Sequence, residues 1–209
     1  MLTFTTGLVD AVSYLGLGRV FTANMTGNVV LLGFGVVGAG GLPVVSPLVS
    51  LCAFLAGAVG SGRLAARFAS DRRVHLARTL AIEVALIAVA VVLAATGAVH
   101  ANRFSGDLVI ALLALAMGVR SATVRRLGVP DLSTVVLTMT LIGLASDSPI
   151  AGHDGAGSLR RGGAVAAMFA GAVAGALLLR TSLTLPLAAA ALLALATWVL
   201  YARAIEPAG

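Results

Sequence analysis

Lysine is absent from this chain of 209 residues, and charged residues of any kind make up only 11% of it. All fourteen positive charges are arginines, aromatic residues amount to 5%, and Cys52 is the one cysteine. A soluble domain carries about 25% charged residues, so an ordinary soluble globular protein is excluded. The single cysteine excludes an intrachain disulfide and a thiolate-rich metal centre, and a P-loop would require the missing lysine.

Apolar residues are what the chain has instead: they form 59% of it, and the mean hydropathy is +1.06. A membrane helix needs about 20 mainly apolar residues. The sequence therefore predicts an all-α fold, a polytopic membrane helix bundle of six to eight helices. The expected segments cover roughly residues 2–18, 24–40, 45–66, 76–98, 106–122, 132–146, 163–180 and 183–202. The second and sixth are shorter and more polar than the rest.

Two halves of the chain resemble each other. Residues 7–11 match residues 118–122 at an offset of 111, and residues 56–59 match 170–173 at an offset of 114. Between these matches, Thr22 and Thr26 align with Thr134 and Thr138 at an offset of 112. We expect a first membrane repeat over 1–98, a linker over 99–105 and a second repeat over 106–209, all in one integral membrane domain. Two-repeat membrane proteins are often transporters with a substrate site between the halves.

The arginines lie mostly in short gaps between apolar segments, which is typical of positive charge kept on the cytoplasmic side of a membrane. The net charge of +6 is therefore not read as nucleic-acid binding. With eight spans, the arginines divide ten to four and both termini face outward. If the second and sixth segments are re-entrant, the arginines divide eleven to three between the two sides of the membrane. Both termini are then cytoplasmic, and the repeats are inverted. The charge bias supports either topology.

Polar motifs interrupt the apolar segments. The first half contains Gly7-Leu-Val-Asp10-Ala-Val-Ser13 and Phe21-Thr-Ala-Asn24-Met-Thr26-Gly27-Asn28. The second half contains Arg125-Arg-Leu-Gly-Val-Pro130-Asp131-Leu-Ser-Thr134. In these motifs, and over essentially its whole length, the chain resembles the YoaK family of uncharacterised bacterial membrane proteins. The resemblance implies a multi-pass protein of the bacterial inner membrane and implies no reaction.

Asp10 lies in an apolar segment, where an ionised carboxylate costs several kcal/mol unless it is paired or hydrated. Arg120 lies at the matching depth of the second half, so we expect the two side chains to face each other across the repeat interface. The alternative is that each snorkels to water near its helix end. Glu83 is a candidate proton relay, or else it pairs with Arg78, one turn away.

Amides and hydroxyls gather at the start of the second and sixth segments. A helix that begins at membrane depth can present its N–H groups to an anion, and broken helices form substrate sites in transporters. The alternative is hydrogen bonding between helices without a ligand. The predicted substrate-binding residues are Asp10, Asn24, Thr26, Asn28, Arg120, Thr134 and Thr138. Two small-xxx-small pairs, Gly57 with Ser61 and Gly171 with Gly175, suit close helix packing.

Signals for enzymatic chemistry are weak. Residues 33–38 match the dinucleotide-binding glycine pattern, but no strand precedes them and no acidic residue follows at the required spacing. The three histidines fall in expected loops, so we expect no catalytic site, metal or cofactor. The sequence favours a small-solute transporter or permease in contact with the bilayer, and oligomerisation is left open. A non-transporting scaffold or partner-binding subunit is the alternative, and a lipid-modifying enzyme ranks below both.

Overall fold

A computed structural model of the chain describes residues 1–68, 72–127, 137–152 and 157–205, and within them all regular structure is helical. The α-helices are α1 (Leu2–Val12), α2 (Met25–Val36), α3 (Val45–Arg67), α4 (Arg72–Ala95), α5 (Phe104–Leu127), α6 (Leu137–Ser146), α7 (Ser158–Leu179) and α8 (Thr184–Ile205). A π-helix, η1 (Ser13–Gly18), extends α1, and short 3-10 turns follow α2 and α6 as η2 (Ala39–Gly41) and η4 (Pro149–Ala151). The predicted all-α class is confirmed.

Five helices, α3, α4, α5, α7 and α8, are long and apolar enough to cross a membrane. Many large apolar side chains on the outside of the bundle are exposed, as contact with lipid requires. The helices α2 and α6 have 12 and 10 residues. At a rise of about 1.5 Å per residue, each covers only about half of the ~30 Å hydrocarbon layer. The chain is a multi-pass membrane protein, and over the residues that the structure describes α2 and α6 are half-length helices.

The helices of the bundle run in two opposite directions. Arg120, late in α5, donates to the carbonyl of Leu2 at the start of α1 (3.1 Å). At the other end, the amide of Asn102, just before α5, donates to the carbonyl of Leu17 in η1 (3.2 Å). The segment α1–η1 and α5 therefore run antiparallel. The same ends are joined by Ser46 at the start of α3, whose hydroxyl donates to Asp107 of α5 (2.7 Å).

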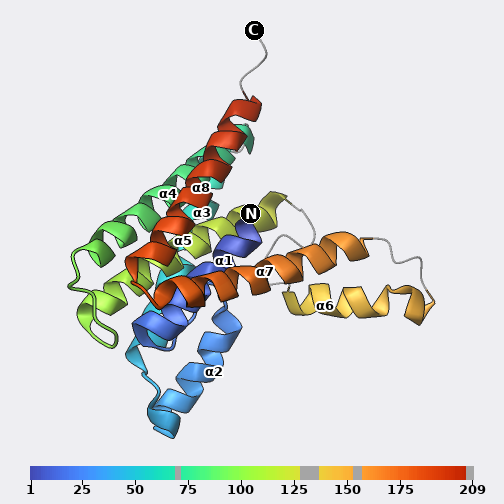
Figure 1. Cartoon of the computed structure of the whole chain (residues 1–209). Coiled ribbons are helices and arrows are strands. Elements are labelled where there is room, and N and C mark those ends of the chain that lie inside the picture. Colours follow the sequence, from blue (N-terminus) through green and yellow to red (C-terminus); the bar gives the residue numbers. More distant parts are fainter. Residues whose placement is uncertain (69–71, 128–136, 153–156, 206–209) are drawn as a thin grey trace.

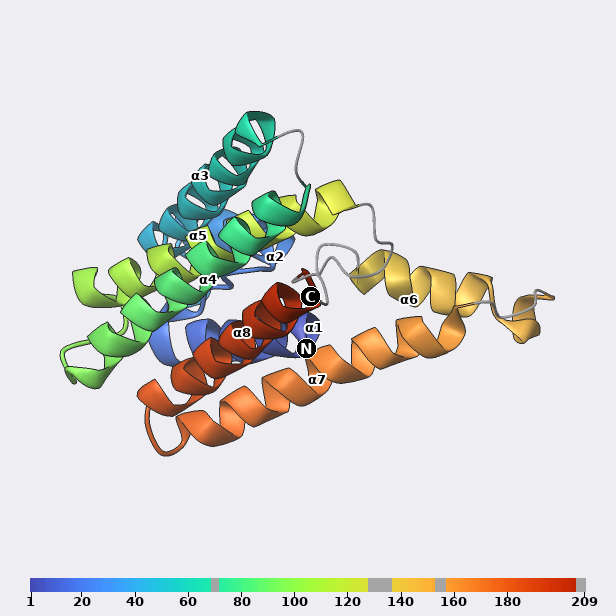
Figure 2. The same ribbon diagram turned by 90° about the horizontal axis from the view of Figure 1, so that it is seen from above.

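Helices from the two halves of the chain pack against each other. The most extensive helix contacts pair α3 with α5 and α1 with α7, which are neighbours in space from opposite halves of the chain. Figures 1 and 2 show α1 crossing the middle of the bundle against α7, with α6 lying alongside α7, and α2 packs against α3. The buried apolar core lies where α1, α4, α5 and α8 meet.

Glycine residues permit the close contacts of α1 with α7 and of α3 with α5. A Cβ on Gly7 would lie 2.2 Å from the carbonyl oxygen of Met168, and one on Gly118 would lie 2.1 Å from that of Phe54. A Cβ on Gly57 would lie 2.2 Å from the Leu115 oxygen. Only a residue without a side chain fits such backbone contact, so these glycines set the spacing of α1 from α7 and of α3 from α5.

The other small residues expected at helix interfaces lie on the same two faces. A Cβ on Gly171 would lie 2.0 Å from the carbonyl oxygen of Phe4, and one on Gly175 would lie 2.8 Å from that of Leu8. From the first of these contacts to the second, the residue number rises by four on α7 and by four on α1, so α1 and α7 run parallel. The hydroxyl of Ser61 on α3 lies 3.0 Å from that of Thr123 on α5.

A glycine-to-alanine pair on α3 tests this packing. Gly57→Ala is expected to lower the free energy of unfolding by about 1–3 kcal/mol, because the added methyl group forces α3 away from α5. Gly60→Ala on the same helix is the control, since nothing lies within 4 Å of its Cβ position. Denaturation of the purified protein in detergent measures both. Equal stability of the two variants would contradict the close packing.

Candidate functional site

Asp10 anchors the chain where it turns back into the bundle after η1. The helix ends at Arg19, which takes a left-handed conformation with φ of 53°. The returning chain places the amides of Thr22 and Ala23 2.9 Å from Oδ1 of Asp10, to which both donate. The hydroxyl of Thr22 donates to the same oxygen at 3.4 Å. One carboxylate oxygen thus holds residues 22–23 against the middle of the α1–η1 segment that precedes them.

The start of α2 is capped by the side chain of Asn24. The side-chain oxygen of Asn24 accepts from the amide of Gly27 (3.2 Å), so Asn24 is the N-cap residue. Asn28 accepts from the amide of Phe21 (2.8 Å) and donates to its carbonyl (2.6 Å) and to Ser50 on α3 (3.1 Å). At the start of α2, the amide of Gly27 is therefore taken by Asn24, while Asp10 takes the amides of Thr22 and Ala23 just before the helix.

A cavity of about 430 Å³ lies between the starts of the two half-length helices. Its polar side chains are Asp10, Asn24, Thr26 and Thr138, four of the seven substrate-binding residues predicted from the sequence. Its apolar wall contains Met25, Val30, Phe54, Leu137, Leu141 and Met168. The structure thus brings α1, α2 and α3 of the first half together with α6 and α7 of the second half around one space.

The second oxygen of Asp10 distinguishes this cavity. The side chain of Asp10 has 5% of its surface exposed, and Oδ2 has no hydrogen-bond partner among the residues that the structure describes. An unpaired buried acceptor costs roughly 1–3 kcal/mol, and more if it is charged. Asp10 thus brings a buried acceptor without a described partner to the wall of the cavity.

Three of the predicted site residues lie elsewhere or outside the description. Asn28 is fully buried and holds the turn before α2 to α3 rather than lining the cavity. Thr134 falls in 128–136, outside the described residues. The predicted pairing of Asp10 with Arg120 is wrong, because Arg120 pairs with Glu83.

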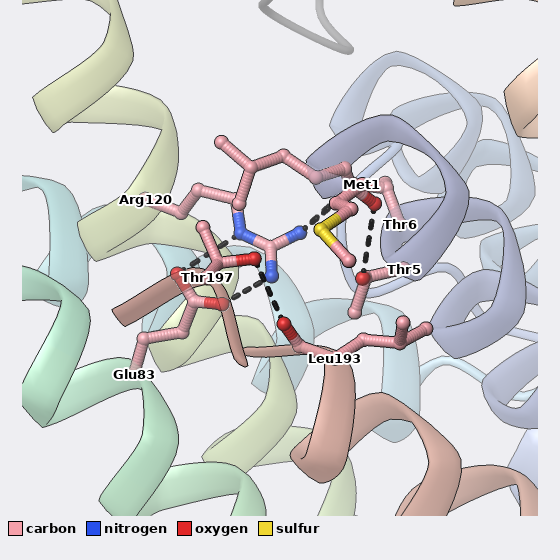
Figure 3. Close-up of polar contacts among 8 residues, drawn as sticks. Met1, Thr5, Thr6, Glu83, Arg120, Leu193 and Thr197 are labelled. Atoms are coloured by element: carbon pink, nitrogen blue, oxygen red, sulfur yellow. Dashed lines mark hydrogen bonds and ion pairs between the residues drawn. The ribbon is translucent and has the colours of Figure 1, made fainter. Parts of the chain in front are cut away.

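The ion pair between Glu83 of α4 and Arg120 of α5 is buried, with 1% and 6% of the side chains exposed (Figure 3). Two guanidinium nitrogens of Arg120 donate to the two carboxylate oxygens, with Nε lying 3.0 Å from Oε2. The third, Nη1, donates to the carbonyl of Leu2 and the hydroxyl of Thr6, both at 3.1 Å. The expected pairing of Glu83 with Arg78 is wrong: Arg78 stacks on the ring of Phe68. Glu83 as a proton relay remains a prediction.

The ion pair between Glu83 and Arg120 could have been predicted from the sequence. The helices α4 and α5 are joined by only eight residues, 96–103, so they pack as antiparallel neighbours. Glu83 lies 12 residues before the end of α4 and Arg120 lies 16 residues after the start of α5, at comparable depth. Opposite charges at comparable depth in such a hairpin are expected to pair. The alignment of the two halves instead led to the prediction that Arg120 faces Asp10.

These observations define the class: a multi-pass helical membrane protein with a polar, acid-containing cavity among its helices. The chain belongs to a family described as "Protein of unknown function (DUF1275)", whose model matches residues 1–200. It is 32% identical over 151 residues to the UPF0700 transmembrane protein YoaK of Bacillus subtilis (strain 168). That match covers 70% of this chain and 64% of the relative, so the chain spans about two thirds of that relative's length. No solved structure matches the chain. The predicted family resemblance is confirmed.

A double-mutant cycle tests the buried ion pair. Glu83→Met and Arg120→Met are each expected to lower the free energy of unfolding by about 3–5 kcal/mol, because each leaves a buried charge without its partner. The double variant is expected to recover part of this loss, since no charge remains to be buried. Denaturation in detergent measures all four proteins. Arg125→Met, at an exposed arginine of α5, is the control. Strict additivity of the two losses would contradict the pairing.

Proposed function

We propose that this protein is a permease for a small solute, with its substrate site in the cavity between two inverted halves. Asp10, Asn24, Thr26 and Thr138 are its polar binding residues. The observation that carries the proposal is that both half-length helices begin at the same cavity, which also contains a buried carboxylate oxygen without a described partner.

The sequence repeat and the helix directions support inverted halves. Gly7 approaches Met168 as Gly118 approaches Phe54, and each pair of equivalent residues is separated by 111 or 114 positions, the offsets of the sequence repeat. The first helices of the two halves, α1 and α5, run antiparallel. Residues 1–98 and 106–209 are then two copies of one helix pattern, inserted in opposite orientations.

The two half-length helices leave the cavity in opposite directions. Asn28 of α2 contacts Ser50 of α3, and Gly35 lies against the carbonyl of Pro43 just before α3, so α2 runs toward the end where α3 begins. Gly143 of α6 accepts from Arg161 near the start of α7 (2.8 Å), so α6 runs toward the end where α7 begins. Helices interrupted at mid-membrane are how many transporters form solute sites.

Equivalent residues meet in the cavity wall. Thr26 and Thr138 are repeat mates at an offset of 112, and Phe54 and Met168 are mates at 114. All four line the cavity, which supports a position on the proposed axis between the halves. A solute bound there contacts both halves, and their relative movement would expose it to either side in turn.

The arginines support one orientation of the proposed permease. In the six-span arrangement, eleven arginines belong to the segments at the end that contains the start of α1, and Arg19, Arg103 and Arg180 belong to the opposite end. By the positive-inside rule, the arginine-rich end faces the cytoplasm of a bacterial inner membrane. Both termini are then cytoplasmic.

Interhelical hydrogen bonding without transport, the scaffold alternative, accounts for Asn28, Ser50, Ser61 and Thr123, which hold helices together. It leaves the cavity and the unpaired oxygen of Asp10 without a role. A locking residue is expected to be buried and bonded, whereas Thr138 is exposed.

Cysteine accessibility tests the permease without knowledge of the solute. In a Cys52→Ser background, Thr138→Cys is expected to react with a membrane-impermeant charged thiol reagent, because a permease cavity is reached by water. The reaction is measured in intact spheroplasts and in inverted membrane vesicles. A permease predicts labelling from both sides of the membrane, and labelling from neither side would overturn the proposal.

A lipid-facing cysteine is the matched control. Val59 lies on α3, is 53% exposed, and does not line the cavity. Val59→Cys is expected to stay unlabelled, since a thiol in hydrocarbon does not ionise to the reactive thiolate. A reporter fused to the C-terminus, active only in the cytoplasm, checks the orientation in the same cells.

A further inference from the structure

The chemistry of the cavity narrows the class of solute. Among the described residues that line it, Asp10 is the one ionisable side chain, and no arginine or histidine is present. The oxygen Oδ1 is already used by the turn before α2, whereas Oδ2 has no described partner. The site therefore offers an incoming molecule one carboxylate acceptor.

Helix electrostatics do not turn the site toward anions. The start of a helix carries a partial positive charge of about half a unit, which on its own favours an anion. At α2 this charge lies beside the carboxyl group of Asp10, and the amides of Thr22, Ala23 and Gly27 already donate to side chains. The charged group that remains for a ligand on this side of the cavity is the buried Oδ2 of Asp10, beside the uncharged side chains of Asn24 and Thr26.

The remaining walls are suited to an organic group. Met25, Phe54, Leu141 and Met168 contribute apolar surface, and the volume of about 430 Å³ lies within the ~300–1,000 Å³ range of small-molecule sites. A bare metal ion would be poorly served, since sodium or calcium requires several oxygen ligands. Here the oxygen-bearing side chains besides Asp10 are Asn24, Thr26 and Thr138, and the Asn24 oxygen already caps α2.

We propose that the cavity binds a small organic amine, whose protonated nitrogen pairs with Oδ2 of Asp10 while its carbon skeleton lies against the methionine and phenylalanine side chains. This inference rests on the proposed function and names its substrate class. Alkyl amines are protonated at neutral pH, as lysine is with a pKa of about 10.4. A charge-assisted hydrogen bond to a shielded carboxylate is strong enough to select a cation over a neutral isostere.

The test uses the full chain purified into lipid nanodiscs, with n-butylammonium as the probe at neutral pH. Isothermal titration and the shift in melting temperature measure binding. Sodium, n-butanol and butyrate are the comparison ligands, because they supply the charge alone, the chain alone and the opposite charge. Binding is expected for n-butylammonium and not for the other three.

Asp10→Asn is the diagnostic variant, since an asparagine keeps an oxygen that accepts from Thr22 and Ala23 but places an uncharged donor at Oδ2. It is expected to weaken n-butylammonium binding by about tenfold or more. Asp107→Asn is the matched control: the same change at the opposite end of the bundle, at a carboxylate that accepts from Ser46, is expected to leave binding unchanged. Should Asp10→Asn fail to fold, Thr138→Trp fills the cavity without touching Asp10 and is expected to abolish binding.

The outcomes separate this inference from the proposal beneath it. Equal binding of n-butanol would overturn the amine assignment in favour of an apolar site, and binding of sodium alone would overturn it in favour of a metal ion. If no probe binds although Thr138→Cys is labelled from both sides, the amine assignment is wrong and the permease stands. If no probe binds and no labelling occurs, both are wrong.

Discussion

The carboxylate of Asp10 is the constraint on which the site depends. Backbone amides that leave a helix need acceptors, and inside a membrane no water supplies them. Oδ1 of Asp10 accepts from two such amides and so permits the chain to turn back at mid-depth and begin α2 there. Asn28 and Ser50 then secure the same turn to α3. Without these acceptors a half-length helix starting inside the bundle would have no stable beginning, and the cavity would have no first wall.

Sequence reasoning recovered the helices because each is a long apolar run or a capped start: the eight expected segments correspond to α1–η1 and α2 to α8, with ends that differ by a few residues. It also singled out Asp10, Asn24, Thr26 and Thr138, since polar groups in apolar helices need a reason to be there. It could not supply Phe54 or Met168, because an apolar residue that faces a cavity looks the same in sequence as one that faces lipid.

The error over Arg120 has a physical origin. Repeat alignment places residues at equivalent depth, but depth alone does not say which neighbour a side chain meets. The short connection between α4 and α5 makes those helices adjacent, and Glu83 lies within reach of Arg120 as a result. Asp10 and Arg120 have instead become separate polar centres, one beside the cavity and one within the bundle. The partner of Arg120 is thus set by the adjacent helix along the chain and not by the alignment of the halves.

The glycine contacts between halves bear on how the protein is made. The partner of α1 is α7, which emerges from the ribosome after about 150 further residues have been synthesised. Until then α1 lacks the helix that Gly7 packs against, and α3 lacks α5 in the same way. Neither half can close its own interior, so the order of synthesis leaves the N-terminal helices in a provisional arrangement that is completed only when the seventh helix arrives. The packing of the N-terminal helices is therefore completed late, after nearly the whole chain has been synthesised.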